Sequence, residues 1–175
     1  VCRKLKLNFN EVMRLAATKW NFVKYKPGLV GGHCLPVDPY YFSHLSKKNN
    51  IKTKITLAGR STNDNLVNFI IKEFFKFLKR KKIKNKKTRV LVVGLTYKSN
   101  VSDIRNSLAM SVFRKIKSKF KSVTGYDPIV SKEISRRIGT INLEKEIGTY
   151  NVVLFLTRHK KTKKFYKKII KNKKK

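Results

Sequence analysis

Acidic residues are scarce in this 175-residue sequence, which has 9 Asp and Glu against 44 Lys and Arg and a formal net charge of +35. Clustered cations release counterions from nucleic acid, so polyanion binding is one hypothesis. The lysines, however, run through every segment, and arginine, which reads guanine edges and forks onto phosphates, is the minority cation. Compositional drift is therefore the favoured explanation. Non-specific binding to polyanions at low salt follows from either explanation of the charge.

Cysteine is nearly absent as well. Cys2 and Cys34 cannot build a disulfide framework, and no CxxC pair suggests a metal site. No apolar run approaches the roughly 18 residues that a bilayer span needs, and no signal peptide is visible. These absences predict no metal, no membrane and a cytoplasmic location. Because the sequence begins at Val1 inside an expected helix, we expect a fragment or a truncated reading frame.

Proline and glycine gather in one place. Residues 24–39 hold three of the four prolines and three of the eight glycines, so they predict an ordered loop. Before this loop, apolar residues at positions 5–20 recur at helical spacing, and Asn8 or Asn10 could cap a helix that ends near Ala17.

After the loop, the aromatic residues from Tyr40 onward begin another helix. A broad apolar stripe then runs over Leu57–Leu78. It predicts one long, well-buried helix and a candidate interface for a homodimer. Residues 79–88 carry no apolar side chain except Ile83, which is typical of a linker.

The pattern changes beyond this linker. Short β-prone runs and a helical spacing alternate, with strands expected at 89–94, 123–126 and 152–156 and a helix at 108–120. That order indicates an open, doubly wound α/β domain. We therefore predict an α/β protein with a helical central segment (1–80), a basic linker (81–88) and a Rossmann-like α/β domain (89–175).

Cys34 is the residue most suggestive of chemistry. It follows Gly31, Gly32 and His33 in a loop whose glycines let a ligand approach the backbone closely. Thiolates are strong nucleophiles, and Asp38, four residues on, could come near the thiol if a turn intervenes. A lone cysteine is more often a small buried apolar residue, so both interpretations stay open on this pattern.

A second group of polar residues runs from Gly94 to Ser107, between an expected strand and an expected helix. It would occupy the carboxyl edge where α/β sheets bind ligands. Lys98 and Arg105 supply positive charge, and the helix start supplies amide donors for an anion. The absence of GxGxxG excludes the usual dinucleotide loop. A loop in which Asp103 or Ser107 simply caps the helix fits the same residues.

These motifs resemble those of the UDP-glucose/GDP-mannose dehydrogenase family, particularly the branch that oxidises UDP-N-acetylhexosamines. The segments similar to its nucleophile region are 18–22, 26–34 and 37–41. Those similar to its C-terminal signature are 94–98 and 103–107, with Tyr126-Asp127-Pro128 and the strand before His159. The resemblance extends from Val1 to about Phe165.

The resemblance implies a two-step oxidation in which two NAD molecules in turn convert the sugar's C6 alcohol to a carboxylate, for polysaccharide precursor synthesis. Cys34 would attack the intermediate aldehyde to give a thiohemiacetal, and a thioester would later be hydrolysed. Asp38 would support the water and the proton transfers.

The resemblance also implies a place for the substrate. The C-terminal α/β domain would hold UDP, Lys98 would contact the nucleotide-sugar, and Arg105 would reach the NAD side. The sugar diphosphate would lie along the glycine-rich loop, with contacts from Tyr25, Lys26, Gly28, Gly31 and Gly32.

Parts of the family pattern are not found in these residues. The NAD-binding domain with its GxGxxG loop, and the upstream Lys, Asn, Thr and Glu that act on the sugar, have no counterpart. We therefore predict no dehydrogenase turnover by the isolated chain. Two other functions remain as alternatives. One is a basic nucleic-acid or polyanion-binding protein, although the sequence offers no helix-turn-helix, zinc or RNP pattern to support it. The other is a structural dimer scaffold built on Leu57–Leu78.

Overall fold

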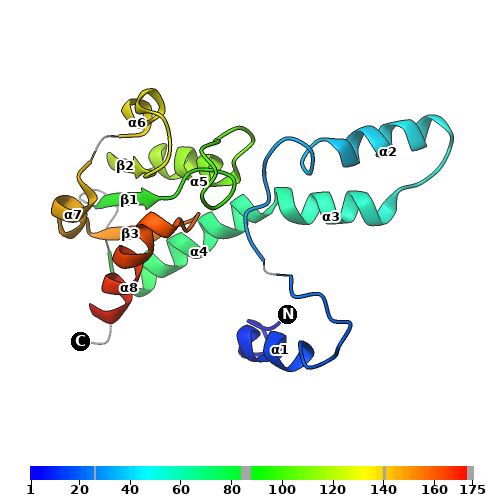
Figure 1. The fold of residues 1–175 in the computed structure, drawn as a ribbon, viewed down its shortest axis with the longest axis horizontal. Helices are drawn as coiled ribbons and strands as arrows, with labels where there is room; N and C mark the ends of the chain where they lie inside the picture. The colour runs from blue at the N-terminus through cyan, green and yellow to red at the C-terminus, as the bar shows by residue number, and fades with distance from the viewer. Residues whose placement is uncertain (26, 84–87, 140, 173–175) are drawn as a thin grey trace.

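A computed structural model describes residues 1–25, 27–83, 88–139 and 141–172 (Figure 1). The N-terminal half is helical and consists of α1 (Phe9–Ala16), α2 (Asp38–Lys48), α3 (Lys54–Asp64) and α4 (Leu66–Arg80). The C-terminal half alternates strands and helices: β1 (Arg89–Val93), α5 (Leu108–Lys117), β2 (Ser122–Tyr126), α6 (Lys132–Ile138), α7 (Leu143–Glu146), η2 (Ile147–Thr149), β3 (Val152–Phe155), η3 (Lys160–Thr162) and α8 (Lys163–Asn172).

The three strands form a parallel sheet in the order β2-β1-β3. Residues Val90–Val93 of the central strand are fully buried, because helices cover both faces. Val90 and Val92 pack in the core formed by α4 and α5, whereas Leu91 and Val93 pack against α7 and α8. The expected doubly wound α/β architecture is confirmed. Helices α6 and α7, between β2 and β3, were not anticipated.

The helix expected over Leu57–Leu78 is interrupted at Asn65, where α3 ends and α4 begins. Helix α4 packs on α5 through Phe74 and Leu78, as a well-buried helix should. In α3 only Arg60 is buried, so the expectation of burial is wrong for this part. The physical reason is that α3 extends beyond the sheet, where it contacts α2 and the start of α4 (Figure 1).

Helices α2 and α3 form an antiparallel pair that projects from the α/β half (Figure 1). A hydrogen bond ties the pair together, since the Tyr40 hydroxyl of α2 donates to Asp64 Oδ2 of α3 at 2.6 Å. Within α3, Arg60 Nη2 donates to Asp64 Oδ1 of the same carboxylate, also at 2.6 Å. The outer surface of the pair is apolar, since Tyr41 is 70% and Leu45 62% exposed.

The ends of the elements follow local capping chemistry. The Asn8 side chain accepts the Asn10 N–H and begins α1, and the Ser107 side chain accepts the Met110 N–H and begins α5. Residues 84–87 of the expected linker lie outside the described residues, so the boundary at 81–88 remains a prediction. Of the helices that the structure describes, none combines the length and apolarity needed to cross a bilayer.

Candidate functional site

A buried polar network joins the three loops that follow the strands. Asp127, directly after β2, accepts the N–H of Leu95 at 2.7 Å and that of Thr96 at 3.1 Å on its Oδ2 atom. The same oxygen lies 3.0 Å from Nε2 of His159, which follows β3. Both side chains are completely buried. The network therefore fixes the relative position of the loops at the carboxyl edge of the sheet.

Hydrogen bonding also defines the tautomer of His159. Its Nδ1 accepts the N–H of Asn100 at 3.0 Å, so the ring proton is on Nε2 and is donated to Asp127. Burial acts to raise the pKa of Asp127, but the hydrogen bonds from His159 and from the backbone of Leu95 and Ile129 outweigh it, and the pKa is lowered. A neutral histidine thus faces an ionised carboxylate.

The loop after β1 does not fit the pyrophosphate of NAD. In a dinucleotide fold, free amides of this loop and of the following helix start bind the phosphates. Here the N–H groups of Leu95 and Thr96 are taken by Asp127. At the helix start, the Ser107 hydroxyl oxygen accepts the Met110 N–H at 3.3 Å and donates its own proton to the Leu95 carbonyl at 2.7 Å.

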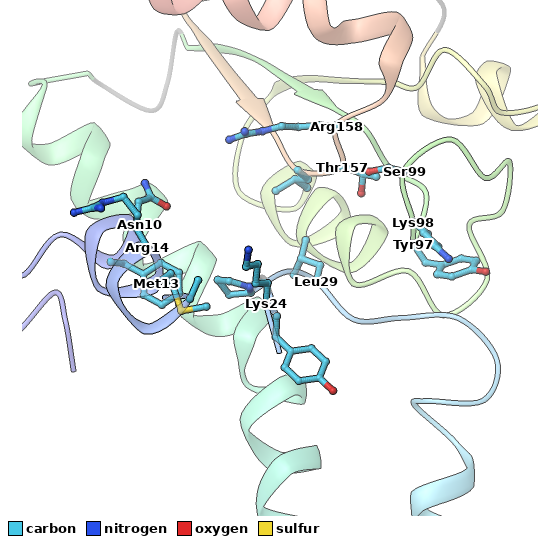
Figure 2. Close-up of a pocket in the computed structure, with 15 residues that line it drawn as sticks. Asn10, Met13, Arg14, Lys24, Leu29, Tyr97, Lys98, Ser99, Thr157 and Arg158 are labelled. Atoms are coloured by element: carbon cyan, nitrogen blue, oxygen red, sulfur yellow. The ribbon is translucent and has the colours of Figure 1, made fainter. Parts of the chain in front are cut away.

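A cleft of about 1020 Å³ opens beside this network (Figure 2). Its lining residues come from α1, from the loop after it, and from the loops that follow β1 and β3: Phe9, Asn10, Met13, Arg14, Ala17, Lys24, Tyr25, Pro27, Leu29, Tyr97, Lys98, Ser99, Leu156, Thr157 and Arg158. Four of them are cations and none is a carboxylate. The cleft is therefore electrostatically suited to an anion.

Two of the expected substrate-binding residues, Tyr25 and Lys98, line this cleft. Lys26 lies outside the described residues. Gly28 is not among the lining residues. A Cβ atom at this position would have no other atom within 4 Å. Sequence reasoning missed Arg14, Lys24 and Arg158 as lining residues. For Arg158 a signal existed, because it closely follows an expected strand at the ligand-binding edge.

Gly31 and Gly32 dock the Cys34 loop against the loop after β1. A Cβ on Gly31 would lie 2.4 Å from the Asn106 carbonyl oxygen, and one on Gly32, whose φ is +101°, would lie 3.0 Å from the Tyr97 ring. Only glycine permits this approach. Tyr97 also lines the cleft, so its side chain connects the glycine pair with the anion-suited cavity.

Cys34 and Asp38 lie at the start of the projecting helical pair. The N–H groups of Val37 and Asp38 both donate to the Cys34 carbonyl at 2.9 Å, so the expected turn is present and leads into α2. Cys34 is an exposed free thiol, which rules out the interpretation as a buried apolar residue. Neither residue is among those that line the cleft.

The two motifs meet in space through Asp103. His33 Nε2, next to Cys34, lies 3.5 Å from Asp103 Oδ2, and Arg105 binds the same carboxylate through Nε and Nη2. Hydrogen bonds from the Arg105 side chain and backbone lower the pKa of Asp103. Ser107 caps α5 as the plain capping interpretation requires. The role of Arg105 towards NAD remains a prediction.

A Gly31→Ala substitution is expected to separate the Cys34 loop from the α/β half, because the added methyl group overlaps the Asn106 carbonyl. Limited proteolysis should then cut within 24–37 at least about tenfold faster, as local opening becomes less costly. Gly28→Ala is the matched control, since nothing lies within 4 Å of its Cβ position. Equal cleavage rates for the two variants would contradict the docking described here.

Comparison with known families gives two matches. Residues 1–65 match the central domain of the UDP-glucose/GDP-mannose dehydrogenase family, and residues 91–175 match its UDP-binding domain. Among curated proteins, Protein CapL of Staphylococcus aureus is 36% identical over 97% of this chain and 41% of its own length. The UDP-N-acetyl-D-glucosamine 6-dehydrogenase of Salmonella typhi is 35% identical over 93% of this chain and 39% of its own length. The chain thus spans about two fifths of these relatives.

Solved structures agree with these matches. A UDP-D-ManNAc dehydrogenase from Pyrococcus horikoshii superposes with a TM-score of 0.77 at 30% identity, covering 90% of this chain and 36% of the other. The UDP-N-acetyl-mannosamine dehydrogenase Cap5O from S. aureus gives a TM-score of 0.74 at 28% identity, covering 93% and 37%.

Proposed function

This chain belongs to the UDP-glucose/GDP-mannose dehydrogenase family, and on that premise we propose that it is the nucleotide-sugar-binding part of a UDP-N-acetylhexosamine 6-dehydrogenase. The main support is the cation-lined cleft, which shares the Tyr97 side chain with the glycine pair that precedes Cys34. A UDP-sugar would place its diphosphate among the cations and extend its sugar towards Cys34. Relatives named as UDP-N-acetyl-D-glucosamine and UDP-N-acetyl-D-mannosamine dehydrogenases support the hexosamine assignment.

In this proposal Cys34 is the nucleophile towards the sugar aldehyde. Its sulfur forms a bond to C6, the carbonyl π bond breaks, and the thiol proton ends on the former carbonyl oxygen, which gives a thiohemiacetal. Asp38 assists the proton transfer from the first turn of α2, on the C-terminal side of the same loop. The exposure of Cys34 supports this role, because a thiol that adds to a substrate must be accessible.

The oxidation also needs a hydride acceptor, which NAD supplies in this family. Since the loop after β1 does not fit the NAD pyrophosphate, we propose that the pyrophosphate binds outside this loop. Arg105 would then contact NAD only at the edge of the NAD site. Accordingly, the chain alone should not turn over a UDP-sugar, and NADH formation by the purified chain would contradict this.

The projecting pair of α2 and α3 also supports a homodimer. Its exposed apolar side chains, with Ile55 90% and Phe42 59% exposed, gain stability if a second copy covers them. The expected interface over Leu57–Leu78 would then consist of the exposed face of α3 together with the outer face of α4.

Protection of Cys34 against alkylation tests the proposed function. UDP-N-acetylglucosamine should slow the reaction of Cys34 with iodoacetamide at least about tenfold at saturation, because a bound ligand excludes the reagent. Peptide mass spectrometry reports both cysteines in one sample, so Cys2, which lies before α1 and not in the loop of the glycine pair, is the internal control. Unchanged alkylation of Cys34 at millimolar UDP-sugar, or equal slowing at Cys2, would count against the proposal.

A further inference from the structure

We propose that Arg158 is a further diphosphate-binding residue of the nucleotide-sugar site. The inference rests on the proposed function and adds a residue that the sequence analysis did not assign to the site. Arg158 is the third residue after β3 and lines the cleft together with Thr157, Ser99 and Lys98 (Figure 2). It therefore projects from the carboxyl edge of a parallel sheet, where such folds bind ligands.

The backbone of Arg158 is held firmly. Its neighbour His159 is completely buried, donates its N–H to Thr162 Oγ1 at 3.2 Å and accepts the Asn100 N–H on Nδ1 at 3.0 Å. Asn100 lies two residues after Lys98 in the loop that follows β1. The hydrogen bond from Asn100 to the His159 ring thus fixes the spacing between the loop that carries Lys98 and the loop that carries Arg158.

The guanidinium of Arg158 is also oriented. Its Cζ lies 4.1 Å from the centroid of the Tyr166 ring in α8, which packs against one face of the planar group. Among the described residues, none forms a hydrogen bond with the guanidinium, so its edges are available for donation to a ligand. A guanidinium with an occupied face and free edges matches the paired oxygens of a phosphate better than a lysine does.

The other arginines near the site are already neutralised. Arg14 binds Glu11, and Arg105 binds Asp103. By contrast, no carboxylate in the described part of the chain forms an ion pair with Arg158. Arg158 is therefore an oriented cation without a carboxylate partner, and it lies at the edge of an anion-suited cleft. This arrangement favours an anionic group of the ligand as its partner.

Calorimetric titration of the full chain with UDP and with uridine tests this role. Arg158→Ala should weaken UDP binding about 10- to 100-fold, the effect of removing charge-assisted hydrogen bonds, and leave uridine binding unchanged. Arg158→Lys, which keeps the charge but not the fork, should recover only part of the loss. Arg136→Ala, at an exposed position of α6 outside the cleft, controls for net charge and should bind UDP like the unaltered chain.

The outcomes are distinguishable. If the unaltered chain does not bind UDP, the proposed function fails. If it binds UDP and Arg158→Ala binds equally well, the role of Arg158 is refuted while the proposed function stands. An equal loss of UDP and uridine affinity in Arg158→Ala would also refute it, because such a change reports a distorted cleft instead of a lost phosphate contact.

Discussion

Replacement of Asp127 by alanine is expected to lower the free energy of unfolding by about 3–5 kcal/mol, because each buried donor left without an acceptor costs about 1–3 kcal/mol. The substitution leaves the N–H groups of Leu95 and Thr96 and the ring N–H of His159 without their acceptor in the interior. Urea unfolding at neutral pH, followed by circular dichroism, measures the loss. A change below about 1 kcal/mol would show that the network is not needed for stability.

The pH dependence of the Asp127→Asn variant provides a second measurement of the same network. The folded pKa of Asp127 lies below its unfolded value of about 3.9, so the ionised group stabilises the fold above that pH. Its contribution is lost as the pH falls through the folded pKa. The stability difference between the unaltered chain and Asp127→Asn should therefore be constant above about pH 5 and shrink below pH 4. Glu133→Gln, at a 73% exposed side chain, is the control and should show little pH-dependent difference.

Gly94→Ala is expected to prevent stable folding, with a loss greater than about 4 kcal/mol. Gly94 has φ +82°, and an added Cβ would lie 1.8 Å from the carbonyl oxygen of Thr157. The backbone cannot move aside easily, because the Gly94 N–H donates to Tyr126 at 2.8 Å and its carbonyl accepts the Thr157 N–H at 3.1 Å. The thermal unfolding midpoint and the yield of folded chain measure the effect.

Gly148→Ala is the matched control for this variant. Nothing lies within 4 Å of its Cβ position, and its φ is outside the positive region, so we expect a change within about 0.5 kcal/mol. A Gly94→Ala chain that unfolds at the same temperature as Gly148→Ala would mean that the strand ends are not packed as described.

The agreement between sequence and structure is best where local chemistry alone decides. The run Val90–Val93 is aliphatic without interruption and β-branched except at Leu91, and such a run forms a strand buried on both faces in almost any context. Asn8 and Ser107 likewise cap their helices through bonds to residues only two or three positions away. The family resemblance, which depends on contiguous motifs, is confirmed by the comparisons.

Expectations were less accurate where partners come from elsewhere in the chain. The apolar spacing continues across Asn65, so periodicity cannot reveal that α4 lies on the sheet and α3 extends past it. Helix α7 spans only four residues, too few for a helical period to be recognised.

For the site, the sequence alone determined the candidate residues that the proposed function uses: a thiol at Cys34 behind two glycines, and a lysine at Lys98 after a strand. Only the tertiary structure decided what surrounds them, including the cleft that brings Arg14 and Arg158 together from opposite ends of the chain and the buried pairing of His159 with Asp127. The physical reason is range. Backbone conformation and reactivity depend on neighbouring residues, whereas electrostatic complementarity and burial depend on distances that exist only after the strands have paired.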